Sequence, residues 1–142
     1  MSVLKAILEP PPPDLSVPSR YTGFNGWIYL IIGVWLIFWP GVVQSVLRDR
    51  PYVGSEEGLM RAIGLAVVVI GWLYLFGGRS GSRHVVAASV IDRWIFVPLV
   101  ALPLAYAGVF PHLMVAFTIL DVSLATGAWA LLRRYRTSSP AP

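Results

Sequence analysis

Four long apolar stretches dominate the chain, at residues 24–43, 58–77, 85–110 and 112–132, and most charged residues lie between them. Each stretch reaches about 20 residues, the length that an α-helix needs to cross the hydrocarbon core of a bilayer. Aromatic residues mark both ends of the first stretch, as is typical of helices that meet the two membrane interfaces. The pattern therefore predicts an all-α membrane protein, a bundle of four transmembrane helices within residues 23–136.

The segment before this domain, residues 1–22, has a different pattern. Residues 2–9 place apolar side chains at helical spacing, which fits either a short interfacial helix or a frayed terminus. Pro10–Pro13 form a stiff polyproline spacer, and residues 14–22 continue as an extended polar linker. We therefore expect an extended proline-rich N-terminal arm before the bundle, and a disordered tail at residues 137–142.

The third apolar stretch is the least regular. It contains Asp92 and Arg93 side by side, and two prolines, Pro98 and Pro103, which favour bends. Neighbouring residues on a helix point about 100° apart, so each of the two charges needs its own partner. Residues 85–91 lie either within the membrane or along its interface, and the pattern leaves both alternatives open.

Composition supports the membrane assignment and excludes several functions. The chain is 56% hydrophobic, with a mean hydropathy of +0.70, and only 13% of its residues are charged. It has no cysteine, which excludes disulfides, thiolate catalysis and cysteine-bound metal. The net charge of +4 does not indicate a nucleic-acid partner, because the basic residues lie at the predicted membrane boundaries and not on a soluble face.

Basic residues also predict the orientation. One side of the predicted bundle carries Lys5, Arg20, Arg79, Arg83, Arg133, Arg134 and Arg136, whereas the other carries Arg48, Arg50 and Arg61. Loops rich in lysine and arginine stay in the cytoplasm. We expect both termini to be cytoplasmic, in a multi-pass protein of the bacterial inner membrane.

Asp121 is the most informative residue, because it is a carboxylate near the middle of the fourth apolar stretch. A charge at that depth costs about 2.5–3.5 kcal/mol, so we expect it to face other helices. Counting depth along alternating helices predicts two polar layers, Arg61 with Asp121 and Tyr74 with Asp92. Arg93 is expected to reach headgroups or a neighbouring chain. The network is interpreted as structural, with a proton relay, a ligand counter-ion or a catalytic acid as alternatives.

Small residues predict where the helices pack closely. Gly64 and Gly71 lie seven residues apart in the second stretch, an interval that Gly78 continues, and Ala62 and Ala66 lie four apart. In the fourth stretch one face of the helix combines small and polar residues, namely Thr118, Asp121, Ala125 and Ala128, and Thr118 is expected to belong to the same polar network as Asp121. We expect both faces to be helix–helix contacts.

No catalytic or metal-binding constellation is found. His84 and His112 are predicted at opposite membrane faces, and no serine has a histidine and a carboxylate arranged for nucleophilic catalysis. We therefore expect no enzyme activity and no intrinsic cofactor, although a bound lipid or quinone is compatible with the apolar bundle.

Three segments, RAIGLAVVVIGWLYLFGG, DRWIFVPLV and ILDVSLATGAWAL, resemble small bacterial four-helix integral membrane proteins of the DoxX-like kind. The resemblance covers roughly residues 24–135. Some members of that group are associated with quinone-linked membrane oxidoreductases, so the resemblance implies a redox link.

Two functions follow as expectations. The first is a non-catalytic accessory or structural subunit of a larger bacterial membrane complex, with other integral membrane subunits and lipids as partners. The alternative is a stand-alone bundle that binds or transports a lipophilic molecule such as a quinone, lipid or terpenoid. In that case Asp121, Arg61 and Tyr106 would supply polar contacts.

Overall fold

The computed structural model describes residues 10–136, and their regular structure is helical throughout. Four helical segments are long and apolar enough to cross a membrane: α2 (Val17–Phe38), α4 (Glu56–Arg79), the segment Arg83–Tyr106, and α7 (Pro111–Arg136). The segment Arg83–Tyr106 consists of α5 (Arg83–Ile91), the π-helical turn η1 (Asp92–Phe96) and α6 (Val97–Tyr106). The chain is therefore a multi-pass membrane protein, as the hydropathy pattern predicts.

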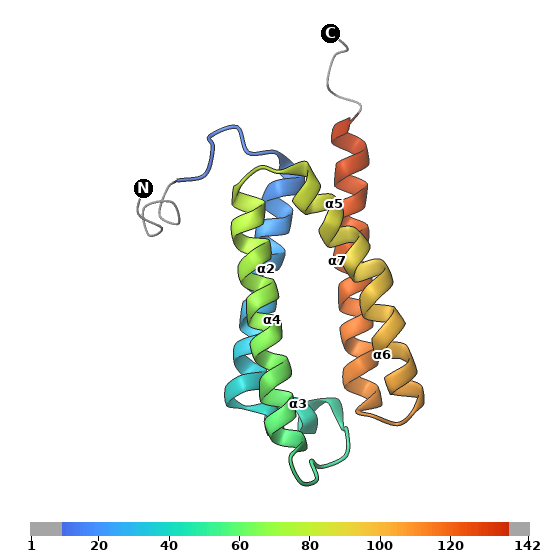
Figure 1. The fold of residues 1–142 in the computed structure, drawn as a ribbon. Helices are drawn as coiled ribbons and strands as arrows, with labels where there is room; N and C mark the ends of the chain where they lie inside the picture. The colour runs from blue at the N-terminus through green and yellow to red at the C-terminus, as the bar shows by residue number, and fades with distance from the viewer. Residues whose placement is uncertain (1–9, 137–142) are drawn as a thin grey trace.

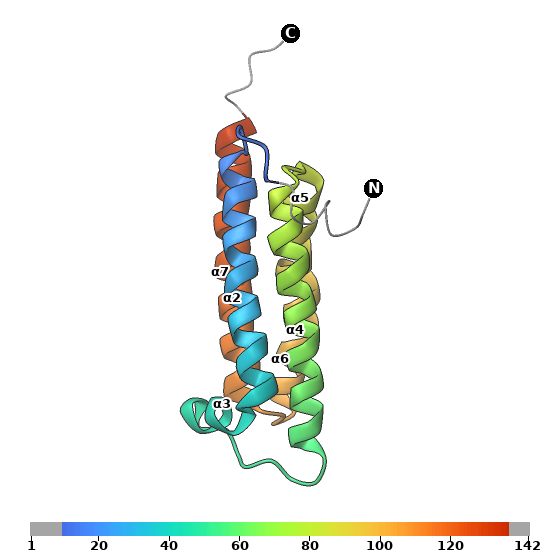
Figure 2. The same cartoon turned by 90° about the vertical axis from the view of Figure 1, so that its left-hand side faces the viewer.

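The four segments alternate in direction, so that α2 begins and α7 ends at the same end of the molecule (Figure 1). We call this the terminal end. The opposite end, here the α3 end, carries the short helix α3 (Pro40–Leu47), the loop before α4 and the turn between α6 and α7 (Figure 1 and Figure 2). Helix α3 begins at Pro40, because proline is tolerated in the first turn of a helix, where the missing N–H leaves no bond unmade.

The first transmembrane helix begins earlier than the sequence predicts. Ser16 is the N-cap of α2 and its hydroxyl accepts a hydrogen bond from the Ser19 amide, while Pro18 occupies the first turn, where a missing N–H costs nothing. The expected extended linker at residues 14–22 is thus wrong from Val17 onward. Pro10–Pro13 are outside any helix, and the expected short helix at residues 2–9 and tail at 137–142 lie outside the described residues.

Helices α2 and α4 pack with their backbones in contact through glycines seven residues apart on both helices. A Cβ atom on Gly71 would lie 2.7 Å from the amide nitrogen of Leu30 and 2.8 Å from the carbonyl oxygen of Gly26. A Cβ on Gly33 would lie 2.8 Å from the carbonyl oxygen of Gly64. The predicted close approach at Gly64 and Gly71 is confirmed, and its partner surface is the glycine face of α2.

The other predicted small faces divide into two cases. Ala125 and Ala128 are fully buried on α7, where they pack against Val86 and Val90 of α5. Ala62 and Ala66, in contrast, are exposed on the outer side of α4. The face of α4 that packs inside the chain is therefore the glycine face, which also carries the buried side chains of Met60, Val67 and Tyr74.

The third span bends at a π-helical turn just before Pro98. The amide of Val97 bonds to the carbonyl of Asp92, five residues back instead of four. Pro98 has no amide to offer the preceding turn, so an undistorted helix would leave a carbonyl unpaired there. Residues 85–91 belong to the continuous helical segment that begins at Arg83, which favours the alternative that places them in the span.

Candidate functional site: a buried polar cluster beside an apolar cavity

Asp121 lies at the middle of α7 and is almost completely buried, with 1% of its surface exposed. Its partner is Tyr29 of α2, whose hydroxyl donates a hydrogen bond to Oδ1. The expectation that Asp121 faces other helices is therefore met. The hydrogen bond also joins the first and last spans at about mid-depth.

The predicted pair of Arg61 with Asp121 is wrong. Arg61 is exposed near the start of α4, where it donates to the carbonyl oxygen of Ile37 at 2.9 Å and to Glu57 at 2.8 Å. Helix α4 packs mainly against α2, and it is α2 that meets α7 and supplies the donor for Asp121. Matching depth alone did not identify the neighbouring helix.

The predicted contact between Tyr74 and Asp92 is present. The Tyr74 hydroxyl donates to Oδ2 of Asp92 at 2.6 Å, joining α4 to the π-helical turn. The Tyr74 ring also meets the Tyr29 ring edge to face, with 5.4 Å between centroids. The two tyrosine rings therefore connect the Tyr74–Asp92 hydrogen bond to the Tyr29–Asp121 hydrogen bond.

Arg93 is completely buried, so the expectation that it reaches headgroups or a neighbouring chain is wrong. Its Nε donates to the carbonyl oxygen of Ser89 at 2.8 Å and a terminal nitrogen to the Ser89 hydroxyl at 2.9 Å. The guanidinium carbon lies 4.9 Å from the centre of the Tyr74 ring. The side-chain amide of Asn25 is oriented so that its oxygen accepts from Arg93 at 3.0 Å and its nitrogen donates to the carbonyl oxygen of Tyr21.

We call these interacting residues the polar cluster: Asn25, Tyr29, Tyr74, Ser89, Asp92, Arg93 and Asp121. Within the described chain, every buried side-chain nitrogen and oxygen has a hydrogen-bond partner. Buried polar groups stabilise a single arrangement when they are fully satisfied and are costly when they are not. The cluster therefore fixes how the two halves of the bundle meet.

Three members of the polar cluster were not singled out from the sequence: Asn25, Tyr29 and Ser89. A signal was available, because Thr22, Asn25 and Tyr29 recur at three- and four-residue steps within an otherwise apolar span. Thr118, which was expected in the network, lies outside it. Its hydroxyl bonds back to the carbonyl oxygen of Met114 at 2.9 Å, one turn earlier on the same helix.

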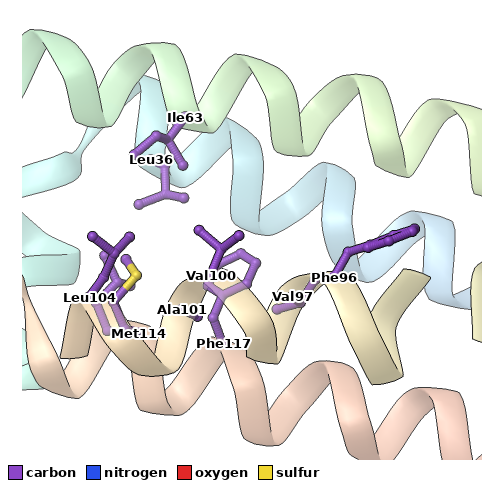
Figure 3. A pocket seen from close by; sticks show the side chains of 10 residues that line it. Leu36, Ile63, Phe96, Val97, Val100, Ala101, Leu104, Met114 and Phe117 are labelled. Carbon is purple, nitrogen blue, oxygen red and sulfur yellow. The ribbon is translucent and has the colours of Figure 1, made fainter. Parts of the chain in front are cut away.

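A cavity of about 350 Å³ lies between the α2–α4 pair and the α6–α7 pair. Figure 3 shows Leu36 and Ile63 on one side, facing Val100, Leu104, Met114 and Phe117 on the other. Phe117 lies one helical turn from Asp121, and Val97 one turn from Arg93. The lining is apolar and the cavity is open at its side, so it offers space for hydrocarbon next to the polar cluster.

None of the three ligand contacts expected from the sequence lines this cavity. Asp121 is buried against Tyr29, Arg61 is turned toward Glu57, and Tyr106 is 97% exposed at the end of α6. A second apolar cavity, of about 210 Å³, lies between α2, α3 and α7 and shares Leu113 and Phe117 with the first.

The α3 end is held by Asp49, a loop residue whose role the hydropathy pattern does not reveal. Its carboxylate accepts the amides of His112 at 3.1 Å and Leu113 at 2.8 Å, so it caps the start of α7 from a different loop. Nearby, burial raises the pKa of Tyr52, which donates its hydroxyl to the carbonyl oxygen of Pro40 at 3.0 Å. These contacts fix the end of α7 that forms one wall of both cavities.

Metal coordination has no candidate site within residues 10–136, where no three histidine or acidic side chains gather. Comparison of the chain with family models, curated proteins and solved structures gives no match.

Proposed function

We propose that this protein binds a lipophilic molecule, whose hydrocarbon chain enters the side of the bundle and occupies the apolar cavity. The observation that carries the proposal is the cavity itself, with its volume of about 350 Å³ and its lining of aliphatic and aromatic side chains. Ligand pockets typically begin at about 300 Å³. The apolar lining favours an acyl or isoprenoid chain over a polar headgroup, because a headgroup would find no hydrogen-bond donor there.

The surrounding membrane is proposed to be the bacterial inner membrane, with both termini in the cytoplasm. Within the described residues, the α3 end carries three arginines, Arg48, Arg50 and Arg61, whereas the terminal end carries five: Arg20, Arg79, Arg83, Arg133 and Arg134. This asymmetry supports the orientation under the positive-inside rule. The DoxX-like resemblance and its redox link stay predictions.

Native mass spectrometry of the full chain, purified in mild detergent, tests the proposal. We expect a monomer that retains one lipophilic molecule. Val100 lines the cavity and is 60% exposed, so Val100→Trp should fill the opening and remove the molecule without disturbing buried residues. The matched control is Leu99→Trp, which changes the next residue, 67% exposed but outside the lining. Equal retention by both variants would contradict the proposal.

A second candidate, the accessory subunit of a larger membrane complex, is favoured by a different feature. Gly58, Ala62 and Ala66 form an exposed stripe of small residues at four-residue intervals on α4. Stripes of this kind let another transmembrane helix approach closely. If the chain is such a subunit, Ala62→Leu should release a co-purifying integral membrane partner, whereas Val100→Trp should leave that partner bound.

A further inference from the structure

A small cavity of about 90 Å³ opens at the terminal end. It adjoins the polar cluster at one point, where the Ser89 hydroxyl donates to the carbonyl oxygen of the lining residue Val86 at 2.8 Å. It lies where the start of α2, the start of α5 and the end of α7 meet, and its lining includes Ser16, Ser19, Arg83, Val86, Leu132 and Tyr135. Its volume corresponds to about three water molecules, which is room for a phosphate-sized group.

The polar part of the lining suits an anion. The side chain of Arg83 is exposed, and among residues 10–136 it has no hydrogen-bond or ionic partner. An arginine guanidinium presents several donors in a geometry that matches phosphate oxygens. The Ser16 hydroxyl donates to the Ser19 hydroxyl at 2.9 Å, so of the two it is Ser19 that keeps a proton for a further acceptor at this wall. The cavity therefore combines an unengaged cation with hydroxyl groups.

Backbone groups at the cavity add to this preference. Arg83 is the first residue of α5, and no side chain caps that helix start. The start of α2, at Val17, adjoins the same cavity through its N-cap Ser16. The start of α5 carries partial positive charge and amides without helical partners, so it favours an anion over a cation. At the start of α2 the Ser16 hydroxyl already accepts the Ser19 amide, so that start adds partial positive charge alone.

The position of the cavity indicates where the anion comes from. Three of the four candidate spans have an end at its wall: α2 near Ser16, α5 at Arg83 and α7 at Tyr135. This is the level of lipid phosphates, and Val86 with Leu132 continues the wall toward the hydrocarbon region. Within the described chain, Asp14 is the one carboxylate at this end outside the spans. The surroundings are therefore strongly basic.

We propose that this cavity binds the phosphate group of an anionic phospholipid, with Arg83 as the main contact. The proposal is independent of the lipophilic molecule in the larger cavity, because the two sites lie at different depths and share no residue. A free phosphate ion has the same recognition chemistry, so the test separates the two sources.

The experiment uses the full chain in nanodiscs of phosphatidylcholine with increasing phosphatidylglycerol, followed by native mass spectrometry of retained lipid. We expect one phosphatidylglycerol per chain, and about tenfold weaker retention in Arg83→Gln, the ratio expected for one charge-assisted contact. Arg48→Gln is the matched control, since Arg48 is also exposed but lies at the α3 end. It should retain the lipid as the unchanged protein does.

Two results would overturn the proposal. Equal loss of phosphatidylglycerol in Arg83→Gln and Arg48→Gln would show that the lipid responds only to overall charge. The second result would be the loss of retained phosphatidylglycerol when excess inorganic phosphate is added, together with binding of phosphate itself to the chain. That result would assign the cavity to a soluble ion. Circular dichroism confirms that each variant keeps its helices before lipid retention is compared.

Discussion

The contact between α2 and α4 and the contact between this pair and the α6–α7 pair are built in opposite ways. Glycines at matching intervals let the backbones of α2 and α4 touch, so that a single added Cβ would collide with main-chain atoms. Toward α6 and α7 the facing side chains are large, among them Phe96, Leu104 and Phe117, and a cavity lies between the two pairs. Glycines have no side chain, so α2 and α4 can pack closely. Between the two pairs, bulky side chains keep the helices apart and leave a cavity.

Replacing Gly71 by leucine should have the largest effect, because it breaks the tight half of this comparison. The new Cβ would lie 2.7 Å from the amide nitrogen of Leu30, which belongs to a helix and cannot give way. We expect a loss of about 3 kcal/mol or more in stability, seen as poor yield and a lower unfolding temperature in detergent.

Gly58→Leu is the matched control for this change. Gly58 lies on the same helix with nothing within 4 Å of its added Cβ, so the variant should retain the yield and unfolding temperature of the unchanged protein. If Gly71→Leu were equally harmless, the glycine face would not be what holds α2 against α4.

The hydrogen bond from Tyr29 to Asp121 links the α2–α4 pair to the α6–α7 pair. Its removal should have an intermediate effect on stability. Asp121→Leu leaves the Tyr29 hydroxyl without its acceptor, and Tyr29→Phe leaves the buried carboxyl without its donor. Each change should cost about 1–3 kcal/mol. The double variant Tyr29→Phe with Asp121→Leu should cost clearly less than the sum, because neither group is left unpaired.

Thermal unfolding of the two single variants and the double variant completes this cycle. The control is Arg61→Leu combined with Asp121→Leu, which should show no recovery, since Arg61 contacts Glu57 and the Ile37 carbonyl instead. Simple addition of the Tyr29 and Asp121 costs would mean that the two side chains do not depend on each other.

Much of the fold could be predicted because a membrane imposes it. Apolar length predicts the four spans, and glycine spacing predicts the close face of α4. The Tyr74–Asp92 contact was also predictable, since both residues lie on helices joined by a short turn and residue counting fixes their depth. Depth is therefore the quantity that this sequence carries most clearly.

The sequence does not show which helices are neighbours within the plane of the membrane. Arg61 and Asp121 are close enough in depth to suggest a pair, but α2 supplies the partner of Asp121 through Tyr29. Arg93 was misplaced for the same reason. Arg93 bonds to Ser89 one turn earlier on its own span and to Asn25 of α2, and the sequence does not show that α2 faces this side of the third span.

The smallest expected effect concerns Arg61, which lies on the outer side of the tight half. Arg61 forms an ion pair with Glu57, which lies one helical turn earlier, and both side chains are about half exposed, at 47% and 51%. Such pairs contribute about 0.3–0.5 kcal/mol on a helix surface. Arg61→Gln keeps a donor for the Ile37 carbonyl, so its unfolding temperature should stay close to that of the unchanged protein. A loss as large as that of Asp121→Leu would show that Arg61 has a buried role, and would restore the pairing that its depth predicts.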